Sequence, residues 1–308
     1  MNNNKKYNIH PDFAQWANFH PPLNKPTLFF MQNLMGLTYL GEKSDENIIV
    51  EKINIPLESK NIRAIIYTPK NAKSPSPALM YFHGGGFVLP AAPYHYAYAR
   101  QYAKEIGCKV VFVDYPLAPK NKYPIPLNAC FGCYKWLLEH AEALGVNSKK
   151  IMLGGDSAGG CLASTLCMKI YDEKLTMPCA QMLIYPAIPS KEETESMKKF
   201  TDTPMCNSED YKKYEKYYFA NEEIKQDKYV SVVNQKKLTI FPPTYIEVAE
   251  FDCLRDGGLN FAKNLKEANV NVVVHKPKQT IHGYDMVTDS EISKDSMKKR
   301  INFLKKLV

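Results

Sequence analysis

The chain carries a series of short apolar runs of three to six residues, and stretches with helical spacing separate them. A strand buried on both faces needs apolar residues at nearly every position, so such runs between helices predict a parallel sheet covered on both sides. Two segments that alternate apolar and polar residues, 49–55 and 62–67, predict half-exposed strands ahead of the others. The expected fold class is therefore α/β. The apolar runs are residues 78–82, 110–113, 151–153, 181–185, 244–249 and 270–274.

Length and composition narrow the class of protein further. A chain of 308 residues, 45% hydrophobic and 23% charged, can bury a large core and lacks the composition of a disordered protein. No apolar run approaches the roughly 18 residues of a membrane-spanning helix, and no apolar signal-peptide region follows the first lysines. We therefore expect no membrane insertion and a cytoplasmic location, which free cysteines in apolar contexts also favour.

The charge and the cysteines suggest binding functions that their distribution does not support. The net charge of +8 comes from lysines scattered along the chain, so we expect no nucleic-acid binding. The densest basic stretch, 298–306, contains apolar residues at helical spacing and predicts a final amphipathic helix with a solvated face. Cys130 and Cys133 form the one CxxC of the sequence, and no second pair completes a metal site. Buried free thiols are the interpretation, and no metal is expected.

The strongest local signal is Gly155-Asp156-Ser157-Ala158-Gly159, which directly follows the run 151–153 and precedes a helix-forming segment. A G-x-S-x-G between strand and helix is typical of a nucleophile elbow, where small neighbours allow a very tight turn. Such a turn holds the serine at the carboxyl edge of the sheet, near a helix N-terminus that stabilises negative charge. Ser157 is therefore the predicted nucleophile.

A serine hydroxyl needs a base and an acid that orients the base, in the chain order serine, acid, histidine. Only His275 and His282 follow Ser157. His275 lies within a predicted strand, where its side chain would point from the sheet surface. His282 lies beyond that strand beside Gly283, which permits a loop. His282 is the predicted base.

Three acids compete for the orienting role. Asp252 follows the predicted strand 245–251, which places it at the same edge of the sheet as the nucleophile. We expect Asp256 to cap a helix starting near Gly257 or to pair with Arg255. Strand alternation does not exclude Glu250, but its earlier position makes it second to Asp252.

A glycine-rich loop follows the first buried strand, with the sequence His83-Gly84-Gly85-Gly86-Phe87. Glycines let backbone N–H groups turn toward a substrate oxyanion, and the pattern fits the HGGG-type loop. No Gly-Lys-Ser/Thr follows, and no G-x-G-x-x-G lies at the first strand. Phosphate and dinucleotide sites therefore have no support, and no cofactor is expected.

Two regions interrupt the α/β pattern. The first ~45 residues are irregular and rich in aromatic side chains, and residues 191–234 are charged and aromatic without a strand. Tyr211, Tyr214, Tyr217 and Tyr218 recur there at helical spacing, which predicts an inserted helical subdomain. We interpret these tyrosines as packing residues rather than as a cofactor site.

Five ordered motifs occur along the chain: His83–Phe87, Asp114–Lys120, Gly154–Gly160, Asp252–Asp256 and His282–Tyr284. With these motifs the chain resembles the hormone-sensitive-lipase-like esterases (bacterial family IV) of the α/β-hydrolase superfamily. This resemblance implies an α/β-hydrolase fold, with a mostly parallel eight-stranded sheet flanked by helices and a helical cap. It also implies that Ser157, Asp252 and His282 form a catalytic triad, and that the backbone N–H groups of Gly84, Gly85 and Ala158 form the oxyanion hole.

By the same resemblance, residues 1–45 and 191–234 would form the cap, and 46–190 and 235–308 the catalytic domain. Pro116, Lys120 and Cys253 replace the arginine, glutamate and proline usual in the family. We expect these departures to affect loop packing or contacts between subunits rather than the chemistry.

The implied function is hydrolysis of short- to medium-chain acyl esters through an acyl-enzyme, with a small-molecule ester as the partner. An amidase, a formamidase or a carbohydrate deacetylase could use the same triad. A non-catalytic small-molecule receptor of this fold is less favoured, because the base His282 is retained. Whether the chain forms a homodimer is left open.

Overall fold

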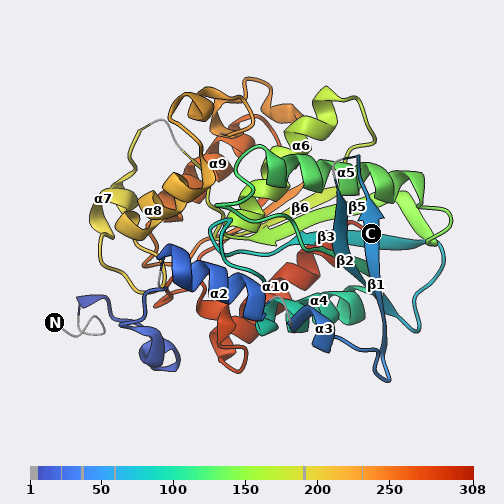
Figure 1. Cartoon of the computed structure of the whole chain (residues 1–308), viewed down its shortest axis with the longest axis horizontal. Coiled ribbons are helices and arrows are strands. Elements are labelled where there is room, and N and C mark those ends of the chain that lie inside the picture. Colours follow the sequence, from blue (N-terminus) through green and yellow to red (C-terminus); the bar gives the residue numbers. More distant parts are fainter. Residues whose placement is uncertain (1–5, 22, 36–37, 59, 190–191, 231) are drawn as a thin grey trace.

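One mixed sheet forms the centre of the molecule (Figure 1). The computed structural model describes residues 6–21, 23–35, 38–58, 60–189, 192–230 and 232–308. The strand order is β1-β2-β4-β3-β5-β6-β7-β8; β2 runs antiparallel to β1 and β4, and every other pair is parallel. This confirms the predicted mostly parallel, eight-stranded sheet. The strands are β1 (Ile48–Pro56), β2 (Asn61–Pro69), β3 (Ser76–Phe82), β4 (Lys109–Val113), β5 (Val146–Asp156), β6 (Ala180–Ile184), β7 (Thr244–Glu247) and β8 (Val272–His275).

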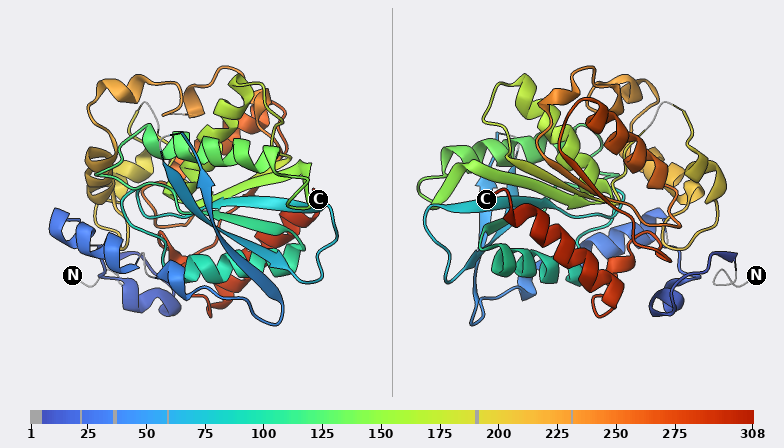
Figure 2. Two further views of the ribbon diagram at one scale, coloured as in Figure 1. Left: turned by 45° about the vertical axis from the view of Figure 1, so that its right-hand side comes forward. Right: turned by 180° about the vertical axis from the view of Figure 1, so that it is seen from behind.

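Helices cover both faces of this sheet (Figures 1 and 2). The helices α4 (Pro93–Ile106) and α10 (Glu291–Lys305) lie on one face. The other face carries α5 (Ile125–Glu139), α6 (Ala158–Asp172) and α9 (Arg255–Glu267). Most residues of α6 are buried, because α6 packs on the central strands and is itself covered by α5. The nearly continuous apolar runs of the central strands agree with a sheet that is covered on both faces.

The N-terminal region and the segment after β6 lie together at the carboxyl end of the parallel strands (Figure 1). Two backbone-directed hydrogen bonds join them: Met205 N to the Phe19 carbonyl at 2.8 Å, and the Tyr217 hydroxyl to the Leu23 carbonyl at 2.9 Å. The elements before β1 are η1 (Pro11–Trp16), α2 (Lys25–Met35) and α3 (Thr38–Gly41), and those between β6 and β7 are α7 (Glu195–Lys199), α8 (Ser208–Tyr218), η2 (Glu223–Gln226), η3 (Val232–Asn234) and η4 (Leu238–Ile240).

The division into cap and catalytic domain stays a prediction. The boundary that it places at 190–191, and residues 1–5, lie outside the described residues.

The final helix differs from its prediction at one position. Met297, Ile301 and Leu304 of α10 are buried as the amphipathic pattern predicts, but Arg300, expected on the solvated face, is completely buried. Its guanidinium pairs with Glu247, with 3.0 Å between Nε and Oε2, and with Asp285, so carboxylates compensate the buried charge.

The cysteines match their interpretation. Cys130 and Cys133 lie in the middle of α5 and are buried. All eight cysteines of the chain are described, and all eight are free thiols.

Candidate active site

Ser157 occupies the single position between β5 and α6, as the elbow motif predicts. Its φ of 52° and ψ of −116° lie in a strained region that costs about 1–3 kcal/mol and persists only where the surroundings hold it. Three backbone hydrogen bonds do so: Ser157 N donates to the Ile184 carbonyl at 2.8 Å, and the Ser157 carbonyl accepts from Cys161 and Ala187. A Cβ at Gly159 would overlap the backbone of β3, so this turn requires glycine there.

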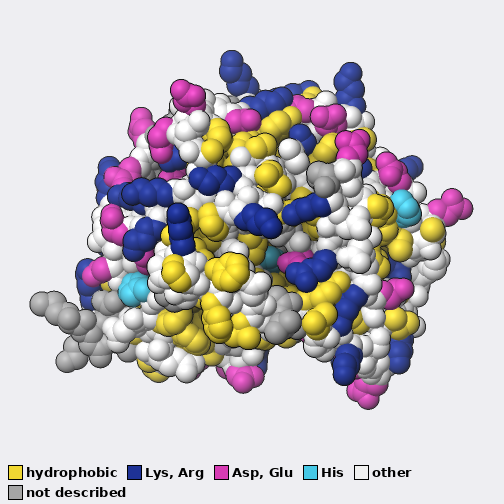
Figure 3. Space-filling model, viewed as in Figure 1, with side chains coloured by type: hydrophobic (Ala, Val, Ile, Leu, Met, Phe, Trp, Pro, Cys, Tyr) yellow, Lys and Arg dark blue, Asp and Glu magenta, His cyan; other side chains and the backbone are white. Residues whose placement is uncertain are grey.

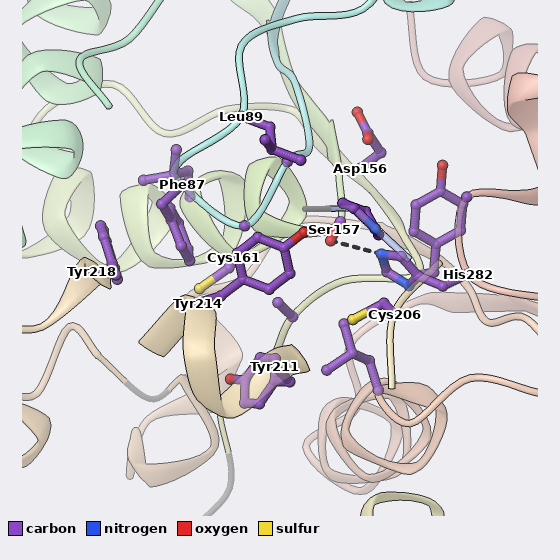
Figure 4. A pocket seen from close by; sticks show the side chains of 18 of the residues that line it. Phe87, Leu89, Asp156, Ser157, Cys161, Cys206, Tyr211, Tyr214, Tyr218 and His282 are labelled. Atoms are coloured by element: carbon purple, nitrogen blue, oxygen red, sulfur yellow. Dashed lines mark hydrogen bonds between the residues drawn. The ribbon is translucent and has the colours of Figure 1, made fainter. Parts of the chain in front are cut away.

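The predicted nucleophile, base and acid lie in a hydrogen-bonded row. The Ser157 Oγ is 2.9 Å from His282 Nε2 (Figure 4), and His282 Nδ1 is 2.8 Å from Asp252 Oδ2. An Nδ1–H that donates to Asp252 leaves Nε2 as the acceptor for the serine proton. The backbone N–H of Leu254 donates to the second oxygen of Asp252 at 2.9 Å, which fixes the carboxylate.

Two loops, rather than two strands, bring Asp252 and His282 together. The strand predicted for 245–251 is wrong in length, because β7 ends at Glu247 and Asp252 lies five residues beyond it. A parallel bridge pairs Phe251 with Ile281, and Phe251 N donates to the Thr280 carbonyl at 2.9 Å. The residues that follow this bridge on each loop are the acid and the base, so the bridge sets them side by side.

Burial and the neighbouring carboxylate act on His282 in opposite directions. Burial alone would lower the pKa of His282, but the negative charge of Asp252, the neighbouring Cys206 and the hydrogen bond with Asp252 outweigh burial and raise the pKa to about 9. A protonated His282 is therefore stabilised within the site.

His275 and Glu250 have other partners. His275 lies in β8, and its Nε2 is 3.1 Å from the Ser296 hydroxyl on α10. Glu250 accepts a hydrogen bond from Gln279 N at 2.7 Å. Neither residue joins the row that contains Ser157.

Asp256 pairs with Arg255 at 2.8 Å, as predicted, and also accepts from Ser196 N at 2.7 Å. The expected helix start near Gly257 with Asp256 as its cap is wrong. The helix α9 begins at Arg255, because the chain already turns after Asp252, and Asp256 lies in its first turn.

The glycine loop after β3 is folded back on itself. Gly85 has a φ of 114°, which favours glycine, and its carbonyl accepts from the N–H groups of Val88 and Leu89 at 3.0 and 2.8 Å. Within the described part of the chain, the backbone N–H groups of Gly84, Gly85 and Ala158 donate to no backbone carbonyl outside regular elements. That these three groups form an oxyanion hole stays a prediction.

Comparison with known proteins agrees with this geometry. The sequence pattern of the alpha/beta hydrolase fold family matches residues 79–286. The chain belongs to the alpha/beta hydrolase fold family. Esterase LipI of Mycobacterium tuberculosis is 31% identical to this hydrolase-fold chain over 222 residues, which cover 71% of the chain and 69% of LipI. Human hormone-sensitive lipase is 33% identical over 139 residues, 44% of the chain and 13% of the lipase.

Solved structures extend the likeness to nearly the whole chain. A bacterial heroin esterase superposes with a TM-score of 0.89 and 29% identity, covering 98% of this chain and 99% of the esterase. The resemblance to hormone-sensitive-lipase-like esterases is confirmed.

A buried carboxylate beside the elbow of this hydrolase fold was not assigned a role from the sequence. Asp156 accepts from the Tyr81 hydroxyl at 2.9 Å and lies 3.2 Å from His95 Nε2. His95 Nδ1 accepts from Ala92 N, so the proton of the neutral ring is on Nε2. Burial alone would raise the pKa of Asp156, but His95 and these hydrogen bonds hold it below its usual value. Asp156 also packs against Gly84, so it connects the elbow to the glycine loop.

The motif 114–120 supports the glycine loop. The Tyr115 hydroxyl donates to the His83 carbonyl at 2.8 Å, and the two rings stack with their centroids 4.5 Å apart. The departures Pro116 and Lys120 line a separate surface cavity, away from the triad. That they alter loop packing or subunit contacts stays a prediction.

A cavity of about 270 Å³ opens over Ser157. Its walls are mostly apolar and aromatic, and Phe87 stacks on Tyr218 with 3.7 Å between centroids (Figure 4). The interpretation of the tyrosines as packing residues was incomplete, because three of them also line this cavity. The aromatic lining residues are Trp16, Phe19, Phe87, Tyr94, Tyr123, Tyr185, Tyr211, Tyr214, Tyr218, Phe219 and Tyr229.

The residues that the structure describes contain no group of three or more His, Cys, Asp or Glu arranged to hold a metal ion. Among them, no helix has both the length and the apolar character needed to cross a membrane.

Proposed function

We propose that the chain is a serine carboxylesterase that hydrolyses short- to medium-chain acyl esters through an acyl-enzyme. The observation that carries the proposal is the continuous row from Ser157 through His282 to Asp252, which opens into an apolar cavity. Similarity to proteins named as esterases supports the same reaction class.

In the acylation step, the Ser157 Oγ attacks the ester carbonyl carbon while His282 Nε2 takes its proton. The carbonyl oxygen becomes negative and accepts hydrogen bonds from the backbone N–H groups of Gly84, Gly85 and Ala158, each worth about 10²–10³ in rate. Asp252 stabilises the imidazolium. His282 then gives the proton to the leaving alkoxide, and the alcohol departs.

Deacylation repeats these steps with water as the nucleophile. His282 removes a proton from water as its oxygen attacks the acyl carbon, and the same N–H groups hold the oxyanion. The proton returns to Ser157 Oγ as the acid is released. No external cofactor enters this sequence.

The volume of about 270 Å³ and the apolar lining of the cavity support the proposed chain length. Its walls offer an acyl chain apolar contact, and the stacked rings of Phe87 and Tyr218 are part of them. Glu215 adds a carboxylate to the lining, but it pairs with Lys225 at 3.2 Å. The site therefore suits an uncharged acyl chain of limited length.

The test is a series of p-nitrophenyl esters from acetyl to palmitoyl, assayed with the wild type, Ser157→Ala and Ser164→Ala. Ser164 is a buried serine of α6 whose hydroxyl donates to the Cys161 carbonyl, so its variant is a matched control. We expect the highest kcat/KM at short to medium chains, loss of several orders of magnitude in Ser157→Ala, and near-normal activity in Ser164→Ala.

An active Ser157→Ala enzyme would overturn the serine mechanism. A preference for palmitoyl over butanoyl esters would contradict the chain length. Turnover of p-nitroacetanilide that equals or exceeds that of p-nitrophenyl acetate would assign the site to amides instead.

A further inference from the structure

Cys206 is a thiol in the wall of the active-site cavity. It lies in the connection between α7 and α8. We call these two helices and their connection, residues 195–218, the α7–α8 segment. The Cys206 side chain is 5% exposed. Figure 4 shows its sulfur beside His282. A small molecule that enters the cavity therefore has access to this thiol.

Cys253 directly follows the predicted catalytic acid Asp252 and is completely buried. Its Sγ lies 3.9 Å from the backbone oxygen of Cys206. A hydrogen bond to the Cys206 side chain, followed by burial, raises the pKa of the Cys253 thiol. The Cys253 thiol therefore lies against Cys206 at the contact between the α7–α8 segment and the loop of the acid.

We propose that Cys206 and Cys253 are a site of reversible disulfide formation, which links the α7–α8 segment covalently to the loop that carries Asp252. The linkage goes beyond the proposed ester hydrolysis, because it requires the two thiols and a peroxide but no turnover.

Hydrogen peroxide supplies the oxidising equivalents in two balanced steps. The Cys206 sulfur attacks one peroxide oxygen and breaks the O–O bond, which gives a sulfenic acid and one water. The Cys253 sulfur then attacks the Cys206 sulfur and displaces the hydroxyl group, which leaves as a second water with the Cys253 proton. Two hydrogens leave the protein, and one disulfide forms.

The other cysteines lack this combination of access and partner. Cys161 lines the same cavity from α6 (Figure 4). Burial alone raises the pKa of its thiol to about 12, and no second thiol contributes to that shift. Cys130 and Cys133 lie close to each other in α5 but do not line the cavity. A small oxidant in the cavity therefore meets one thiol that has a second thiol against it.

The bond would join residues 47 positions apart. Closing a loop of that length in the unfolded chain disfavours unfolding, and the expected rise in Tm is about 5–10 °C. The effect should reverse on reduction with dithiothreitol.

The experiment treats the reduced full-length protein with about a tenfold excess of hydrogen peroxide and measures intact mass, Tm and the alkylated peptides. We expect a mass loss of about 2 Da, protection of Cys206 and Cys253 from alkylation, and the rise in Tm. Cys206→Ala and Cys253→Ala should abolish all three. Cys161→Ala, which removes the other cavity thiol, should retain them.

Several results would overturn the linkage. These are a gain of oxygen on Cys206 without a mass loss, a disulfide between Cys130 and Cys133 instead, or persistence of the mass loss in Cys253→Ala. If Cys253→Ala does not fold, Cys253→Ser keeps nearly the same volume and removes the sulfur. Because mass and Tm require no ester turnover, failure of this linkage and failure of the esterase proposal are distinguishable.

Discussion

Replacing Asp252 with asparagine keeps the shape of the side chain and removes the charge that acts on His282. In the wild type, the pKa of His282 rises from 6.5 to about 9, although burial opposes the rise. The negative charge of Asp252 is the largest contribution that favours the imidazolium. In Asp252→Asn the burial remains and the opposing charge is gone, so the pKa of His282 should fall below 6.5.

The sign of the pH dependence follows from the role of the base. His282 must be neutral to accept the serine proton, so wild-type kcat/KM should increase with pH up to about 9. In Asp252→Asn the increase should occur below pH 6.5, with maximal activity reduced by about 10²–10⁴. A reduction of about 10² would reflect loss of the charge on residue 252 alone. A reduction of about 10⁴ would reflect loss of the correct His282 tautomer as well.

The assay is kcat/KM for p-nitrophenyl butyrate between pH 5.5 and 10, corrected for spontaneous hydrolysis. Asp256→Asn is the control, because it makes the same chemical change at an acid paired with Arg255 outside the row. A wild-type inflection at or below 6.5, or an Asp252→Asn profile with the wild-type inflection and maximum, would refute this account of the electrostatics.

Three further substitutions test the packing around the site. Gly159→Ala should destabilise the fold by about 1–3 kcal/mol in urea titrations, because the added Cβ would overlap the backbone of β3. Gly41→Ala is the control and should leave the stability unchanged, because its Cβ would meet no atom within 4 Å. Tyr218→Ala removes the ring stacked on Phe87 and should raise the octanoyl-to-butanoyl ratio of kcat/KM about tenfold, the value of roughly two buried methylenes. Arg300→Met leaves buried carboxylates unpaired and should cost about 3–5 kcal/mol of unfolding free energy, measured in the same titrations. An unchanged ester ratio or an unchanged urea midpoint would contradict the corresponding contact.

Local rules were sufficient to predict the fold class and the candidate site. A turn as tight as the one at Ser157 demands a short motif, and the carboxyl ends of parallel strands meet at one edge of a sheet. The positions of Asp252 and His282 after Ser157 could therefore be read from chain order. Their alignment by the bridge between Phe251 and Ile281 could not, because the strand β7 ends earlier than the apolar pattern suggests.

What the sequence did not predict depends on contacts between residues far apart in the chain. Arg300 lies in a basic run that is typical of a surface, and it is buried because Glu247, 53 positions earlier, meets it on the sheet. Asp156 acquires its role only when α4 brings His95 against it. Three tyrosines of α8 line a cavity over Ser157 to which residues from the N-terminal region also contribute. No periodicity in the sequence carries this information.

Labelling with a fluorophosphonate tests the central claim most directly, since such probes react with activated serines. The account predicts one adduct per chain on the peptide that contains Ser157, at a rate that falls when His282 is replaced by alanine, and no adduct in Ser157→Ala. An unlabelled wild-type protein, or an adduct on any other residue, would contradict the assignment of Ser157 as the nucleophile.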